Sequence, residues 1–139
     1  MNTVQYTLWL AEQINGALFN FWYITAPLAL LFAIAIAWLF RHRPMQIGSQ
    51  LALLVWPVFP LSLLIIGGVF RVNSGTEPSN GTASTTINVL LGLSFLVHAA
   101  LVARAHGQRL ATSAIGAFGL WLSVCVAFVA GMSVTGDWL

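Results

Sequence analysis

Four long stretches of this chain carry no Asp, Glu, Lys or Arg, and this restricts the possible folds more than any other feature. They are residues 17–40, 47–70, 85–103 and 114–134. A transmembrane helix needs about 20 mostly apolar residues. A membrane strand needs only about ten, with an alternating polarity that these stretches lack. The sequence therefore predicts an all-α integral membrane protein with four transmembrane helices over these ranges.

The rest of the chain cannot compensate for these stretches in water. Hydrophobic types make up 59% and charged types 6% of the 139 residues, whereas an ordinary soluble domain has roughly a quarter charged residues. This excludes a water-soluble globule. The single cysteine, Cys125, excludes a disulfide scaffold. Five arginines without any lysine form no basic face, so we expect no nucleic-acid partner.

The connections between the stretches are short, so residues 1–139 are expected to form one four-helix transmembrane domain. Segments 41–46 and 104–113 each force an antiparallel hairpin, and segment 72–84 is too short for a further domain. The first sixteen residues have no positive charge, which argues against a cleaved signal peptide. They are predicted to form either a short interfacial N-terminal helix on the outer leaflet or an outward extension of the first span.

The arginines distinguish the two sides of the membrane. Four of them fall in segments 41–46 and 104–113, which four spans place on the same side: Arg41, Arg43, Arg104 and Arg109. Cytoplasmic loops are enriched in arginine, so this side is predicted to be cytoplasmic and both termini are predicted to lie outside. The acids all fall on the opposite side: Glu12, Glu77 and Asp137.

The remaining arginine, Arg71, ends the second span on the predicted outer side. We expect its side chain to extend to the interface and to pair with Glu77 or Asp137. Aromatic residues near the ends of the first span, Trp22, Tyr23 and Trp38, are expected at the membrane interfaces. A lysine-free composition is associated with GC-rich bacterial genomes, which points to the cytoplasmic (inner) membrane of a bacterium.

Small residues recur at spacings of three and four in the first and fourth spans. Lipid tails are as apolar as leucine, so helices associate largely through close packing at such residues. We expect these ridges to seat neighbouring helices of the bundle; the alternative is that one ridge is left for a partner chain. The ridge of the fourth span comprises Gly116, Gly119, Ser123, Ala127, Ala130 and Ser133, and that of the first span Ala26, Ala29, Ala33 and Ala37.

Prolines interrupt two of the predicted spans. Pro57 and Pro60 lie in the second span, where each removes a backbone donor and bends the helix. Pro27 adds a bend to the first span. We expect these prolines mainly to shape the bundle; in transporters, such breaks also expose carbonyl groups to an ion or substrate.

His98 is the only ionisable side chain well inside a predicted span. Such groups are costly in lipid and are candidates for function. Three interpretations remain open: a neutral imidazole bonded to Ser94 or to another helix, a proton or substrate site, and an axial ligand to haem. Asn88 is the other polar candidate and is expected to bond across helices. No acid lies inside any of the four spans.

The chain lacks the residue sets that catalysis and metal binding require, so we expect neither an enzyme nor a metal site. There is no CxxC motif, no His/Cys/Asp/Glu cluster and no phosphate-binding glycine loop. The first hypothesis is a small membrane subunit that acts by assembly, as a homo-oligomer or in a larger membrane complex. The alternatives are an oligomeric channel or transporter using His98 and the broken second span, and haem or quinone electron transfer through His98.

Overall fold

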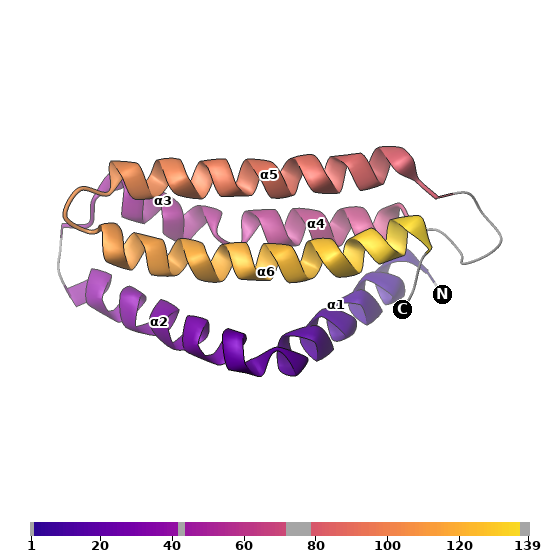
Figure 1. Cartoon of the computed structure of the whole chain (residues 1–139), viewed down its shortest axis with the longest axis horizontal. Coiled ribbons are helices and arrows are strands. Elements are labelled where there is room, and N and C mark those ends of the chain that lie inside the picture. Colours follow the sequence, from indigo (N-terminus) through magenta and orange to yellow (C-terminus); the bar gives the residue numbers. More distant parts are fainter. Residues whose placement is uncertain (1, 42–43, 72–78, 137–139) are drawn as a thin grey trace.

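The structure, a computed structural model, describes residues 2–41, 44–71 and 79–136, and these residues form six helices and no strand (Figure 1). Four helical stretches are long and apolar enough to cross a membrane. They are α2 (Trp22–Arg41), the successive α3 (Ile47–Val55) and α4 (Val58–Val69), α5 (Gly81–Arg104) and α6 (Arg109–Thr135). The expectation of an all-helical chain with four apolar stretches of membrane length is confirmed.

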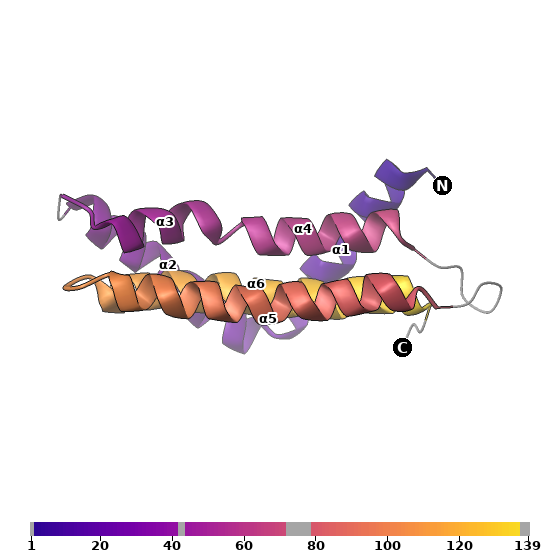
Figure 2. The ribbon, with the colours of Figure 1, turned by 90° about the horizontal axis from the view of Figure 1, so that it is seen from above.

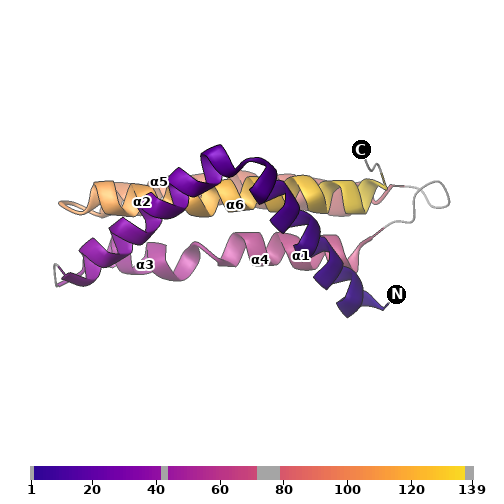
Figure 3. The same ribbon diagram turned by 90° about the horizontal axis from the view of Figure 1, so that it is seen from below.

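The helix α6 is the centre of the bundle, because it packs against each of the other five described helices. Figure 2 shows α5 and α6 side by side in one layer, with α3 and α4 in line along a second layer. The helices α1 (Thr3–Asn20) and α2 form a V across a further face of α6, and Figure 3 shows them crossing the other helices diagonally. The chain therefore passes along the length of the bundle four times, with α1 and α2 together making the first pass.

The first predicted span, 17–40, is wrong as a single helix because the chain turns at Phe21. Helix α1 ends at Asn20 and α2 begins at Trp22. The Thr25 hydroxyl contacts both the Leu18 carbonyl oxygen, at 3.0 Å, and the Phe21 carbonyl oxygen, at 3.1 Å. The hydroxyl thereby gives the Leu18 carbonyl a donor across the turn, while the Phe21 carbonyl also keeps its usual helical donor, the Thr25 backbone N–H at 2.9 Å. Pro27 lies inside α2, six residues after Phe21.

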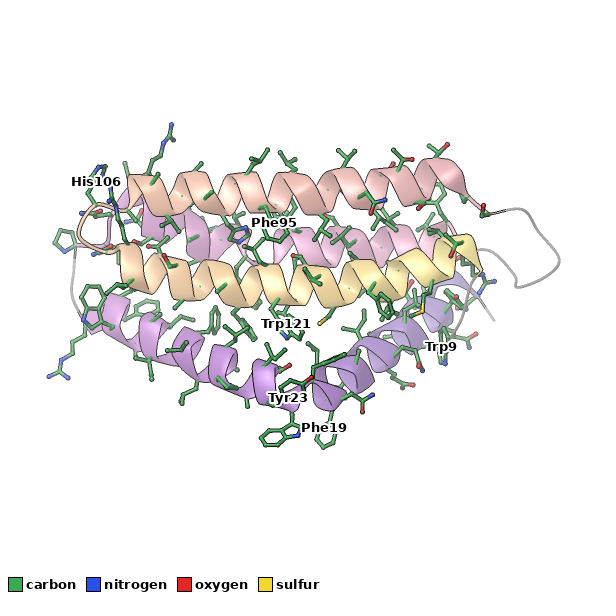
Figure 4. The ribbon with its side chains drawn as sticks, in the orientation of Figure 1. Trp9, Phe19, Tyr23, Phe95, His106 and Trp121 are labelled. Carbon is green, nitrogen blue, oxygen red and sulfur yellow. The ribbon has the colours of Figure 1, made fainter. Side chains whose placement is uncertain are left out.

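The N-terminal segment, expected to be either an interfacial helix or an extension of the first span, forms the separate helix α1. Helix α1 neither lies across the end of the bundle nor extends α2 in a straight line; it packs along α4 and α6. The junction between α1 and α2 lies opposite the middle of α6, because Phe21 contacts the Trp121 ring at a centroid distance of 6.1 Å. Tyr23 is accordingly seen at mid-length of the bundle in Figure 4, away from both of its ends.

The two C-terminal helices are longer than their predicted spans, 85–103 and 114–134. Helix α5 begins at Gly81 because the Asn80 side chain accepts a hydrogen bond from the Ala83 backbone N–H and caps the helix. Helix α6 begins at Arg109, so much of the connection expected over 104–113 is helical. The polar residues at these ends are compatible with helix, although they fall outside the apolar stretches.

Candidate functional site

His98 is almost completely buried, with 3% of its surface exposed. Its Nδ1 atom lies 2.7 Å from the backbone oxygen of Ser94, one turn earlier on α5. Because a carbonyl oxygen only accepts, Nδ1 carries a proton in this contact, which makes Nε2 an acceptor when the ring is neutral. Nε2 is buried and has no hydrogen-bond partner among the described residues. The Ser94 hydroxyl instead donates to the Leu91 carbonyl, at 2.7 Å.

Two glycines of α6 make room for the imidazole ring. A methyl group on Gly116 would lie 3.2 Å from His98 Cδ2, and one on Gly119 would lie 3.2 Å from His98 Nε2. The same position on Gly119 lies 3.2 Å from Trp56 Cβ. The free Nε2 atom therefore faces the point where α5, α6 and the end of α3 meet.

This meeting point coincides with the interruption between α3 and α4. Trp56 and Pro57 separate the two helices, and Pro60 lies in the first turn of α4. Because neither proline has a backbone N–H, the carbonyl groups of Leu53 and Trp56 lose their usual helical donors. The fold thus brings His98 near the proline interruption, an association between two sequence features that are about forty residues apart.

The surroundings of Nε2 do not fit haem. An axial iron must lie directly on the ligating nitrogen with the porphyrin plane around it. The backbone of Gly119 and the side chain of Trp56 approach that position closely, and the Phe59 ring lies 6.1 Å from the imidazole centroid. A porphyrin would need these helices to separate.

The two small-residue ridges have opposite positions in the fold. The ridge of α6 is buried: Gly116, Gly119, Ser123, Ala127, Ala130 and Ser133 all lie against other helices. On α2, by contrast, Ala26, Ala33 and Ala37 are exposed and Ala29 is half-buried. Helix α2 packs on α6 through a different face that includes Ala35 and Leu39. The α6 ridge seats neighbouring helices of this chain, and the α2 ridge faces away from it.

A polar cluster at one end of the bundle was not singled out from the sequence. The Gln108 Oε1 atom accepts hydrogen bonds from the Ser49 hydroxyl, at 2.8 Å, and from the Gln46 backbone N–H, at 3.0 Å. Ser49 also lies 2.9 Å from the Thr112 hydroxyl, and all three side chains are buried. The cluster ties α3 to the start of α6. Sequence spacing carries no signal for it, because about sixty residues separate its two halves.

A second polar cluster lies at the opposite end. The Ser133 hydroxyl donates to the Gly67 carbonyl, at 2.7 Å, and lies 3.1 Å from the Tyr6 hydroxyl. The Arg71 guanidinium lies over the Tyr6 ring, 4.8 Å from its centroid. This contact ties the end of α4 to α1. The acids proposed as partners of Arg71, Glu77 and Asp137, lie outside the described residues.

The described arginines of the predicted cytoplasmic side lie at one end of the bundle. Arg41 ends α2, Arg104 ends α5 and Arg109 begins α6, and these three helix ends lie together in Figure 1. Arg43 lies outside the described residues. The N-terminus of α1, the end of α4 and the start of α5 lie at the other end. This arrangement is compatible with the predicted orientation.

Helix α1 carries polar side chains on its outward face. They are exposed and have no hydrogen-bond or ionic partner among the residues that the structure describes: Glu12, Gln13, Asn15 and Asn20. The positions of these side chains along the bundle follow from two contacts between α1 and the other helices. A methyl group on Gly67 would touch both Leu10 and Ala130, so Leu10 lies at the same height along α6 as Ala130. Phe21 contacts Trp121, which lies near the midpoint of α6. At about 1.5 Å per residue, Glu12 therefore lies about 9 Å from the level of the α6 midpoint, and Asn20 lies almost at it.

Asn88 also faces outward, away from the bundle. It is exposed, and no described residue bonds its carboxamide. The expected bond across helices is therefore not made within the described part of this chain. The described surface includes two open apolar grooves, one of about 510 Å³ between α2 and the start of α6 and one of about 240 Å³ between α1, Pro57 and α6.

Within residues 2–41, 44–71 and 79–136, no three His, Cys, Asp or Glu side chains lie close enough to share a metal ion. Trp121 and Cys125 lie in the middle of α6, where the Trp121 indole N–H donates to the Thr25 hydroxyl at 3.0 Å and Cys125 is buried. Comparisons with protein-family models, curated proteins and solved structures find nothing that matches this chain.

Proposed function

We propose that the protein is a small multi-pass membrane subunit that acts by assembly, as a homo-oligomer or as part of a larger membrane complex, and catalyses no reaction itself. The observation that carries the proposal is the set of exposed polar side chains on the outward face of α1, a face that also presents Leu8 and Phe19. Glu12, Gln13, Asn15 and Asn20 lie beside helices whose other outward faces are apolar. Placing an unpaired amide or carboxylate against hydrocarbon is unfavourable by several kcal/mol, on the order of the cost of an unsatisfied buried polar group.

The level of this face makes lipid an unsuitable neighbour. The hydrocarbon layer extends about 15 Å on either side of its centre. If α6 is centred in it, Glu12 at about 9 Å and Asn20 near the centre both lie within the layer. A partner subunit, or water enclosed by several copies, supplies the hydrogen bonds that lipid cannot. The exposed alanines of α2 give such a neighbour room for close approach.

The test is the mass of the particle in a mild detergent and in lipid nanodiscs. We expect a homo-oligomer or a complex with other membrane subunits. Replacing Asn15 and Asn20 by leucine should reduce the assembled fraction, whereas the outward substitutions Leu54→Ala on α3 and Ile65→Ala on α4, away from α1 and α2, should leave it unchanged. A monomer without partners in native-like lipid would contradict the proposal.

The proposed location is the cytoplasmic membrane of a bacterium, with both termini outside. The clustering of Arg41, Arg104 and Arg109 at one end supports this orientation. In a Cys125→Ala background, an impermeant thiol reagent should label Ser79→Cys from outside. The same reagent should label His106→Cys, at the opposite end (Figure 4), only after the cells are opened. The reverse pattern would overturn the orientation.

A second candidate function, an oligomeric channel or transporter, is favoured by His98. A buried acceptor beside a proline-interrupted helix is an arrangement that binds protons or cations in transporters. Flux measured in proteoliposomes should then fall in His98→Ala. The haem hypothesis predicts a Soret band in the purified protein that His98→Ala abolishes, but the close approach of Gly119 and Trp56 to Nε2 speaks against it.

A further inference from the structure

The apolar groove of about 510 Å³ between α2 and the start of α6, which we call the α2–α6 groove, has one polar end. Its α2 side is one face of that helix and consists of Leu31, Ile34, Ala35 and Trp38. Its other side belongs to residues 107–111 and 114, at the start of α6. Figure 3 shows that α2 crosses α6 diagonally, so its C-terminal end lies to one side of the start of α6. The described part of this chain leaves the groove unfilled.

The groove has the depth of one membrane leaflet. From Leu31 to Trp38 it extends about 10 Å along α2, whereas the hydrocarbon of one leaflet is about 15 Å thick. The 27 residues of α6 extend about 40 Å, so the first turn of a centred α6 lies about 5 Å outside the hydrocarbon layer. The apolar part of the groove therefore adjoins acyl chains, and its end at the start of α6 adjoins lipid headgroups.

The headgroup end of the groove is positively charged. Arg109 lines it, and Arg41 lies one turn beyond Trp38, in the last turn of α2. The only acid that the structure describes is Glu12, on α1, and Figure 1 shows that α1 does not reach this end of the bundle. No described carboxylate therefore balances these arginines.

The start of α6 adds unpaired backbone donors at the same place. No side chain caps this helix, and its first turn contains no acid. The Thr112 N–H donates to the Gln108 carbonyl at 3.0 Å, but the preceding N–H groups of Leu110 and Ala111 have no acceptor among the described residues. Such N–H groups and the helix dipole favour an anion. Arg109, a cation at this positive helix end, is unfavourably placed unless an anion lies beside it.

We propose that the α2–α6 groove binds an anionic phospholipid from the leaflet on the arginine-bearing side of the bundle. One acyl chain lies between Ile34 and Ala114, and the phosphate contacts Arg109 and the N–H groups of Leu110 and Ala111. This inference goes beyond the proposed function and does not rest on it, because it uses neither α1 nor the exposed alanines of α2.

The length and the charge of the groove favour a lipid over a partner helix. A length of about 10 Å corresponds to about two turns of helix, whereas a spanning partner packs along most of the bilayer. An anionic headgroup also supplies the negative charge that no described residue supplies at this end. Basic pockets between transmembrane helices on the cytoplasmic side are typical binding sites for anionic headgroups.

The test is lipid binding to the purified, delipidated full chain, measured by native mass spectrometry. The two probes are phosphatidylglycerol, which is anionic, and phosphatidylcholine with the same acyl chains. We expect one phosphatidylglycerol molecule per chain, bound at least several times more tightly than phosphatidylcholine. Equal affinities for the two lipids would overturn the proposal.

Two arginine variants locate the headgroup. Arg109→Gln removes the charge that lines the groove and should lower the affinity for phosphatidylglycerol about fivefold, the effect of one arginine at an anionic membrane surface. Arg104→Gln is the matched control, because Arg104 ends α5 and does not line the groove. It should leave the affinity nearly unchanged. Equal losses in both variants would mean a general attraction to the arginine-bearing end and would refute a site at Arg109.

Two alanine variants of α6 locate the acyl chain. Ala114→Phe fills the groove and should weaken the binding of both lipids at least several times. Ala117→Phe adds the same ring to an exposed residue outside the groove and should change neither affinity. Unchanged lipid binding in Ala114→Phe would contradict an acyl chain in the groove.

A photoactivatable phosphatidylglycerol tests the site in the unaltered chain. A diazirine on its acyl chain should label the wild-type protein mainly within residues 31–38 and 107–114. Labelling spread evenly over the outward apolar surface, or confined to other helices, would refute the groove as the binding site.

These outcomes are distinguishable from those of the proposed function. A chain that binds phosphatidylglycerol in the groove but stays monomeric without partners would support this inference and contradict assembly. An oligomer or complex whose groove takes no lipid label would refute this inference and leave assembly standing.

Discussion

Substituting alanine for Gly67 tests the packing of α4 against α6 more sharply than any other single change. The added methyl group would lie 2.7 Å from Ala130 Cβ and 2.9 Å from Ala130 Cα. Carbon atoms in favourable contact are separated by about 3.5–4.0 Å, so the two helices must move apart by about 1 Å. Neither atom is the flexible end of a long side chain, so the backbone has to shift.

The magnitude follows from what this shift disturbs. Overpacking in a well-packed core typically destabilises by about 1–3 kcal/mol. The Ser133 hydroxyl donates to the Gly67 carbonyl at 2.7 Å, so the same movement strains the bond that ties α6 to α4. Alanine is intrinsically more favourable than glycine in a helix by up to about 1 kcal/mol. The net expectation is a loss of about 1–3 kcal/mol.

Gly131 provides the matched control, because it is the residue next to Ala130 and a methyl group there meets nothing within 4 Å. The assay is unfolding in mixed micelles of mild detergent and SDS, followed by tryptophan fluorescence. Gly67→Ala should unfold at a clearly lower SDS fraction, and Gly131→Ala at the wild-type value or slightly above it. If both variants unfold together, the close approach of α4 and α6 is not as described.

Further predictions concern the polar contacts. Gln108→Leu removes the acceptor shared by Ser49 and Gln46, so it should destabilise the protein by about 1–3 kcal/mol in the same assay. Gln50→Leu changes an exposed side chain and should have little effect. Similar losses in the two variants would contradict the proposed contribution of the Gln108 cluster to stability. Thr25→Val and Trp121→Phe each break the hydrogen bond between the Trp121 indole and the Thr25 hydroxyl, next to the turn between α1 and α2, so each should lower the free energy of unfolding by about 0.5–1.5 kcal/mol. The double variant should lose less than the sum of the two single losses. Strictly additive losses would mean that this hydrogen bond is absent. His98→Leu removes the unpaired Nε2 acceptor together with the Nδ1 contact to the Ser94 oxygen. It should destabilise by about 0.5–1.5 kcal/mol, the contribution of the one bond that is lost, and a loss of several kcal/mol would contradict an unpaired Nε2.

Much of the architecture could be predicted from hydropathy. Residues such as those of 47–70 are apolar on all sides, and lipid leaves the backbone no solution except helix or barrel. The number of passes then follows from the number of apolar runs, whereas the ends of α5 and α6 do not, because both helices continue into polar residues. The prediction failed at Phe21, because an apolar run shows where a chain can cross a membrane but not whether it turns midway. The turn depends on Thr25 and Trp121, which are 96 residues apart.

Only part of the candidate site could be predicted from the sequence. The isolation of His98 among apolar residues singled it out, since an ionisable group in such a run is rare. Its neighbours Gly119 and Trp56 carried no such signal, and neither did the buried cluster around Gln108. These contacts join helices that are distant in sequence, and residue spacing along one helix contains no information about which side chains another helix presents.

The hydropathy of the sequence is therefore enough to predict a helical, apolar chain that runs along the bundle four times, because these properties arise from each segment separately. Helix packing determines the rest. The α6 ridge is buried against other helices, whereas the α2 ridge is largely exposed. Helix α1 packs along the bundle, and Asn88 faces outward. In lipid, a face that meets another helix and a face that meets hydrocarbon have the same polarity. Shape and hydrogen bonding between distant segments distinguish them, and these exist only once the helices are assembled.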